Sequence, residues 1–96
     1  MATLAPRTVT FAVYGPIERA DLPGLCARVC RLFEAERPDL ALCSVAGVPA
    51  DAVTVDALAR LQAAARRIGC RVRLRHASDE LLELVAFMGL DDVLAA

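Results

Sequence analysis

Hydrophobic and polar residues alternate in two short segments of the chain, residues 8–14 and 71–75. Alternation with a period of two predicts β-strands that have one covered face and one open face. A third segment, residues 40–45, is nearly all apolar, which indicates a central strand. The side chains expected on the covered face of the two alternating strands are Val9, Phe11, Val13, Val72 and Leu74.

Three other segments repeat apolar residues at spacings of three and four, which is typical of amphipathic helices. The first begins after Asp21 and ends at Arg37-Pro38, the second leads to Gly69, and the third runs from Ser78 to Gly89. Asp and Ser are common at helix starts, and Gly is common just after helix ends. The second helix should turn Arg60, Gln62, Arg66 and Arg67 outward, and the apolar side of the third should hold Leu81, Leu82, Leu84, Val85 and Met88.

The predicted order is strand and helix in alternation, three times over, with short connections. This order favours parallel strands joined by right-handed crossovers. A doubly wound sheet would be buried on both faces and would not carry three arginines along one side of a strand. We therefore expect one α/β domain over residues 1–96, with a small mixed or mostly parallel sheet and helices packed mainly on one face.

The composition favours a protein that docks against something. Hydrophobic residues make up 57% of the 96 residues and the mean hydropathy is +0.49, so a domain this small should leave apolar surface outside its core. No run approaches the roughly 20 apolar residues of a membrane span, and the N-terminus lacks the layout of a signal peptide. We therefore expect a cytoplasmic location. A net charge of −1 argues against nucleic-acid binding.

The residues that could carry chemistry form no catalytic or metal-binding pattern. His76 is the only histidine, and no motif pairs it with a nucleophile. Cys26 and Cys30 lie four apart, but structural zinc requires four ligands, so reduced, packed thiols are the expectation. Asp51 and Asp56 are explained by helix capping and solubility. The glycines are isolated, so no phosphate-binding loop is present, and we expect no catalytic residue, no metal and no cofactor.

Several short motifs occur in a familiar order along nearly the whole chain. Residues 13–18 read VYGPIE, residues 42–48 read LCSVAGV, residues 58–74 carry a spaced Leu, Ala, Arg, Gly and Leu pattern, and Gly89-Leu90 closes the series. Together these motifs resemble a STAS domain, the module of anti-sigma-factor antagonists and of the cytoplasmic tails of sulfate transporters. The resemblance implies a STAS-like fold and a non-enzymatic, protein-binding regulatory role in transcription.

The chain departs from this family at the phosphorylation motif. In such antagonists a D-S-S-G-L or D-T-A-G-L motif opens the second helix, and a partner kinase phosphorylates its first hydroxyl residue. The motif falls on residues 54–58, which places the acceptor position on Val55, a residue without a hydroxyl; a slip of one residue in register places it on Thr54. With Val55 there the usual switch cannot operate, while Asp56 supplies a permanent negative charge near the helix start.

The resulting hypothesis is a binding module that docks through the loop at residues 46–57 and the exposed side of the following helix. The residues expected to contact the partner are Gly15, Glu18, Asp51, Thr54, Asp56 and Arg60. By resemblance the partner is a kinase-like anti-sigma factor. The alternatives are a small cytoplasmic STAS subunit that binds the ATPase of a lipid-transport ABC complex, and a nucleotide-binding domain or enzyme. The sequence leaves open whether the chain forms a homodimer.

Overall fold

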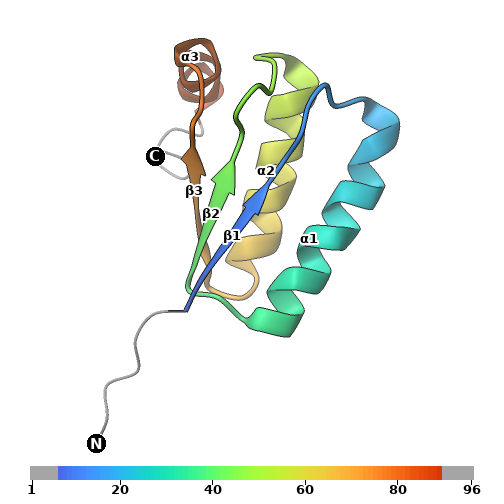
Figure 1. Ribbon diagram of the computed structural model, residues 1–96, viewed down its shortest axis with the longest axis vertical. Coiled ribbons are helices and arrows are strands. Elements are labelled where there is room, and N and C mark those ends of the chain that lie inside the picture. The colour runs from blue at the N-terminus through green and yellow to red at the C-terminus, as the bar shows by residue number, and fades with distance from the viewer. Residues whose placement is uncertain (1–6, 90–96) are drawn as a thin grey trace, which may run out of the picture.

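The computed structural model describes residues 7–89 and contains a three-stranded parallel sheet (Figure 1). The strands are β1 (Thr8–Ala12), β2 (Leu40–Ser44) and β3 (Arg71–Arg75), in the spatial order β1-β2-β3. Thr8 lies beside Leu40, and Leu40 lies beside Arg71, so the three strands start level with one another. Because all three run in the same direction, their carboxyl ends meet at one end of the sheet.

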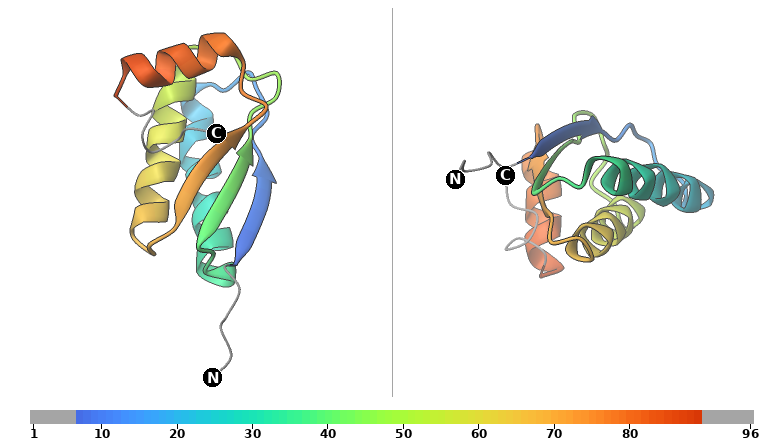
Figure 2. Two further views of the ribbon diagram at one scale, coloured as in Figure 1. Left: turned by 90° about the vertical axis from the view of Figure 1, so that its left-hand side faces the viewer. Right: turned by 90° about the horizontal axis from the view of Figure 1, so that it is seen from below.

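Two of the three helices cover one face of the sheet. Helices α1 (Leu22–Glu36) and α2 (Ala52–Arg66) lie side by side on that face, and a short 3-10 helix, η1 (Arg19–Asp21), leads into α1. Helix α3 (Asp79–Phe87) lies apart from them, across the end of the sheet where the strands finish (Figure 2). The α/β fold with helices mainly on one face of the sheet is therefore confirmed.

The helix boundaries follow from local chemistry. Arg37 adopts the left-handed conformation (φ 47°) at the end of α1, and Pro38 follows it. The Ser78 Oγ atom accepts a hydrogen bond from the Leu81 amide at 3.1 Å, which satisfies one of the free amides at the start of α3. Gly69 has a positive φ after α2, as a helix C-terminus commonly requires.

The core lies between the sheet and the inner side of α2. Ala57, Leu58, Leu61 and Ala65 of this helix are fully buried. Small alanine side chains among the leucines let the helix axis approach the sheet closely. On the α1 side, the rings of Phe11 and Phe33 pack edge to face with their centroids 6.2 Å apart.

Three details differ from the sequence prediction. Gln62 was expected outward but is buried, because α2 buries a wider part of its circumference than its apolar stripe indicates. Met88 was expected on the apolar side of α3 but is 57% exposed, because the helix ends at Phe87 and helical periodicity no longer places the next side chain. Tyr14 lies beyond the end of β1. Leu90, of the closing Gly-Leu motif, lies outside the described residues.

Across residues 7–89, every helix is too short or too polar to cross a lipid bilayer.

Leu74 provides a direct test of the packing between α2 and the sheet. Its side chain is fully buried on β3, whereas the neighbouring Arg73 points to the open face. Leu74→Ala should lower the free energy of unfolding by about 2–5 kcal/mol because it leaves a cavity. Arg73→Ala, measured at protein concentrations low enough to keep the chain monomeric, should change that free energy by less than about 0.5 kcal/mol. Urea denaturation measures both; equal losses would contradict the one-faced packing.

Candidate functional site

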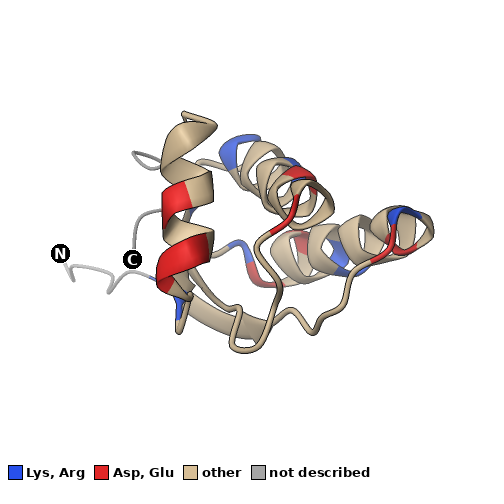
Figure 3. Ribbon diagram, turned by 90° about the horizontal axis from the view of Figure 1, so that it is seen from above, with Lys and Arg blue, Asp and Glu red and all other residues tan. Residues whose placement is uncertain are grey.

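The loops that follow β1 and β2 meet at the carboxyl end of the sheet, which is seen from above in Figure 3. A Cβ atom added to Gly15 would lie 2.7 Å from Cδ of Pro49 and 3.2 Å from Cα of Val48. Only glycine leaves room for this close approach. In the second loop, the Val48 amide donates to the Val45 carbonyl at 3.1 Å and closes a tight turn. The two loops therefore form one continuous surface.

Asp51 fixes the start of α2 at the edge of this surface. Its Oδ1 atom accepts a hydrogen bond from the Thr54 amide at 2.8 Å, so Asp51 is the N-cap residue of the helix. This hydrogen bond favours the charged carboxylate and lowers the pKa of Asp51 below its ordinary value. Of the two carboxylates that the sequence analysis explained by capping and solubility, Asp51 is the one that caps the helix.

Asp56 lies between two arginines from different parts of the chain. Arg19 Nη1 is 3.1 Å from Asp56 Oδ2, and Arg60 Nε is 3.0 Å from Asp56 Oδ1. We call these three residues the Asp56 cluster. Hydrogen bonds from Arg60 and then from Arg19 lower the pKa of Asp56, and the carboxylate in turn raises the pKa of Arg60. Asp56 and Arg60 therefore stay charged at neutral pH, and the contact from Arg19 joins η1 to α2.

Arg19 is the member that sequence reasoning missed. It lies 37 positions before Asp56, and no periodic pattern connects the two residues. The short helix η1 holds it in place: the Glu18 amide donates to Asp21 Oδ2 at 2.9 Å, and the Asp21 amide donates to the Glu18 carbonyl at 2.9 Å. Glu18 itself is exposed beside the cluster.

Both candidate phosphate-acceptor positions are buried. Thr54 has 0% and Val55 has 4% of its surface exposed, and Thr54 Oγ1 has no hydrogen-bond partner among the described residues. An enzyme cannot reach the Thr54 hydroxyl in the folded chain without moving α2. Thr54 is therefore inaccessible to a partner. The other five residues predicted to contact a partner lie at or beside the loop surface: Gly15, Glu18, Asp51, Asp56 and Arg60.

The cysteines and the possible metal ligands among residues 7–89 form no reactive or metal-binding cluster. Burial raises the pKa of Cys43 to about 12 and also raises the pKa values of Cys26 and Cys70, so these thiols remain protonated at neutral pH. Within the described part of the chain, no three His, Cys, Asp or Glu side chains converge as metal ligands would. His76 is exposed in the connection between β3 and α3, where it adopts a φ of 60°.

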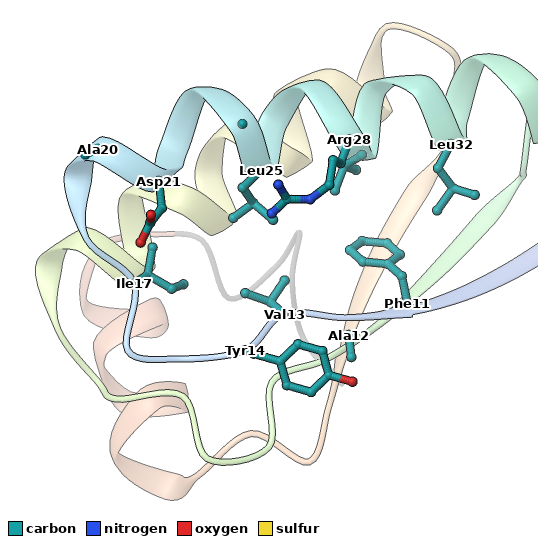
Figure 4. Close-up of a pocket in the computed structure, with 12 residues that line it drawn as sticks. Phe11, Ala12, Val13, Tyr14, Ile17, Ala20, Asp21, Leu25, Arg28 and Leu32 are labelled. Atoms are coloured by element: carbon teal, nitrogen blue, oxygen red, sulfur yellow. The ribbon is translucent and has the colours of Figure 1, made fainter.

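A groove of about 560 Å³ lies between β1 and α1 and was not anticipated from the sequence. Phe11 and Val13 point into it from the strand, and Leu25 and Leu32 face them from the helix (Figure 4). Arg28 is among the residues that line it. Most of the lining is apolar, and its polar side chains are those of Tyr14, Asp21 and Arg28.

Comparison with known proteins identifies the fold. No protein-family model and no curated protein matches this sequence. A solved structure does match: the crystal structure of a sulfate transporter family protein from Wolinella succinogenes is similar with a TM-score of 0.68 and 22% sequence identity, over 92% of this chain and 71% of that one. At this identity the likeness establishes the fold alone. It agrees with the STAS-like fold that the sequence motifs imply.

The Asp56 cluster should make stability depend on pH. A carboxylate whose pKa is lowered in the folded state contributes stability above its unfolded pKa, near 3.8, and this contribution disappears as pH falls through the folded value. Asp56→Asn should therefore lower the melting temperature at pH 7, and the difference from the parent chain should shrink below about pH 4. Glu34→Gln on the outer side of α1 is the control. A difference that is constant with pH would show that the ion pairs contribute nothing.

Gly15 tests the contact between the two loops. Gly15→Ala forces a methyl group against Pro49 and the Val48 backbone and should destabilise the fold by about 1–3 kcal/mol. At Gly24, an added Cβ meets only Arg28 Nη1 at 3.5 Å, so Gly24→Ala should be neutral or stabilising. Thermal unfolding distinguishes the two variants; a neutral Gly15→Ala variant would mean that the loops do not pack as described.

Proposed function

We propose that this chain is a non-enzymatic, STAS-like regulatory module that binds a protein partner through the loop surface and the Asp56 cluster, without a phosphorylation switch. The proposal rests on which side chains are exposed at the start of α2. Thr54 and Val55 are buried, and the anionic group presented there instead is Asp56, held by two arginines. The charge of this surface is therefore constant at physiological pH.

The surface is suited to binding because its charged groups are already ordered. Asp56 is hydrogen-bonded to both arginines, yet its side chain remains 32% exposed, and those of Arg19 and Arg60 are 65% and 51% exposed. A partner that meets groups held in place loses less conformational entropy on binding. Glu18 and Asp51 extend the charged surface beside the cluster, so the partner should present a complementary mixture of charges.

The absence of an accessible hydroxyl at either acceptor position has a regulatory consequence. A phosphate would add roughly −1.5 to −2 charges and repel a partner that must desolvate this surface. Neither Thr54 nor Val55 can accept a phosphate in the folded chain. The concentration of the partner therefore sets how much complex forms. The module then acts as a constitutive binder.

The leading partner is a kinase-like anti-sigma factor, which makes the chain an anti-sigma-factor antagonist or a degenerate relative of one, acting on transcription in the cytoplasm. This identity comes from the sequence resemblance. A second candidate is the ATPase of a lipid-transport ABC complex, with the chain as its small STAS subunit. The solved structure of a sulfate transporter family protein shares the fold with this chain and does not distinguish the two candidates.

Capture of partners from the native host, with a charge-reversed variant as comparison, tests the proposal. The tagged parent chain should retain a kinase-like protein or an ABC ATPase, identified by mass spectrometry, and its intact mass should show no phosphate. Asp56→Arg should weaken that binding by about tenfold or more, because it places three like charges together at the contact. Glu34→Arg, on the exposed side of α1, should leave it unchanged.

Three results would contradict the proposal. Equal retention of the partner by the parent chain and Asp56→Arg would place the contact elsewhere. Phosphate on Thr54 in the purified chain would show that α2 opens and that a switch exists. A copurified nucleotide would favour the alternative of a nucleotide-binding domain. Circular dichroism of each variant establishes that the fold is retained.

A further inference from the structure

The face of the sheet turned away from α1 and α2 is open and basic. Three rows cross it, and each ends in an arginine of β3: Thr8, Leu40 and Arg71; Thr10, Leu42 and Arg73; Ala12, Ser44 and Arg75. All three arginines are exposed, and within residues 7–89 none has an ion-pair partner. Leu40 and Leu42 are partly exposed beside them. We call this surface the open sheet face.

An exposed tyrosine extends the open sheet face at its carboxyl end. Tyr14 lies two residues after Ala12 and, like Ala12, points away from α1, whereas Phe11 and Val13 point toward α1 (Figure 4). The tyrosine is 81% exposed. Tyrosine and arginine are enriched in protein–protein interfaces, so the composition of this face is that of a contact surface.

The outer side of α3 has the opposite charge. Glu80, Glu83 and Phe87 are spaced three and four apart, so they form one stripe along the helix, and all three are exposed. Asp79 lies beside the stripe, and the acidic positions occupy the first two turns of α3 in Figure 3. None of these carboxylates has an ion-pair partner in the described part of the chain. Phe87 is 85% exposed. We call this surface the α3 stripe.

From these two surfaces we propose that the chain forms a dimer in which the α3 stripe of each copy lies on the open sheet face of the other. Each surface supplies what the other lacks: carboxylates and a phenyl ring on α3, guanidinium groups and leucines on the sheet. The arginines at alternate positions of β3 are about 6.6 Å apart, and Glu80 and Glu83 are about 5–6 Å apart at their Cβ atoms, so two ion pairs can form together.

A reciprocal arrangement also explains why a second copy suits this site better than an unrelated acidic protein. In a two-fold dimer, residue i of one copy contacts residue j of the other and the reverse, so one complementary pair of surfaces forms two contacts. The Asp56 cluster of the proposed function is not part of this contact, although Tyr14 belongs to the loop after β1, so the dimer is tested separately through Arg73 and Glu83.

Two charge-reversed variants test the dimer. The parent chain should be a dimer at low ionic strength by sedimentation equilibrium, and its dissociation constant should rise with salt. Arg73→Glu and Glu83→Arg should each weaken the dimer by about tenfold or more, because each change acts at both contacts. Arg66→Glu, exposed at the end of α2, is the matched control and should leave the dissociation constant unchanged.

Mixing the two weakened variants gives the decisive result. In the mixed pair, Glu at position 73 of one copy meets Arg at position 83 of the other, and the original pair meets at the second contact. An equimolar mixture should therefore recover dimers that neither variant forms alone, which a folding defect cannot explain. A monomeric parent chain, a parent dimer insensitive to both reversals, or a mixture that stays monomeric would overturn the proposal.

Discussion

Burial of the start of α2 is the constraint on which the rest of the structure depends. Seven of the fifteen residues of this helix are buried, including Thr54 and Val55 in its first turns. Burial of these side chains fixes the rotation of the helix about its axis. Asp56 and Arg60 are then placed on its solvent-facing side. The Asp51 cap fixes where the helix begins. Core packing therefore decides which functional groups are presented at the carboxyl end of the sheet.

The same constraint underlies the proposal that the chain binds its partner without a phosphorylation switch. A regulated surface needs a hydroxyl that an enzyme can reach, and here the available hydroxyl is enclosed, without a hydrogen-bond partner among the described residues. Its place at the surface is taken by a carboxylate that two guanidinium groups keep charged. The η1 turn positions Arg19 and α2 positions Arg60, and these two side chains hold that carboxylate.

The sequence predicted the fold better than the site, for physical reasons. Alternation of Val72 and Leu74 with arginines located β3 to the residue, because a period of two reports directly on which face is covered. The Ser78 cap was found because one local hydrogen bond defines it. By contrast, the contact from Arg19 to Asp56 joins distant segments and leaves no periodic signal, and the burial of Gln62 depends on neighbours that lie outside its own helix.

Hydrogen–deuterium exchange of the chain, alone and with its copurified partner, tests the central claim most directly. The account predicts that the partner slows exchange at residues 13–18, at residues 45–51 and in the first two turns of α2. Inner residues of α2, such as Leu58, should be protected in both states because they are fully buried. Slower exchange confined to residues 24–32 of α1, or to β3, would contradict a docking surface built on Asp56.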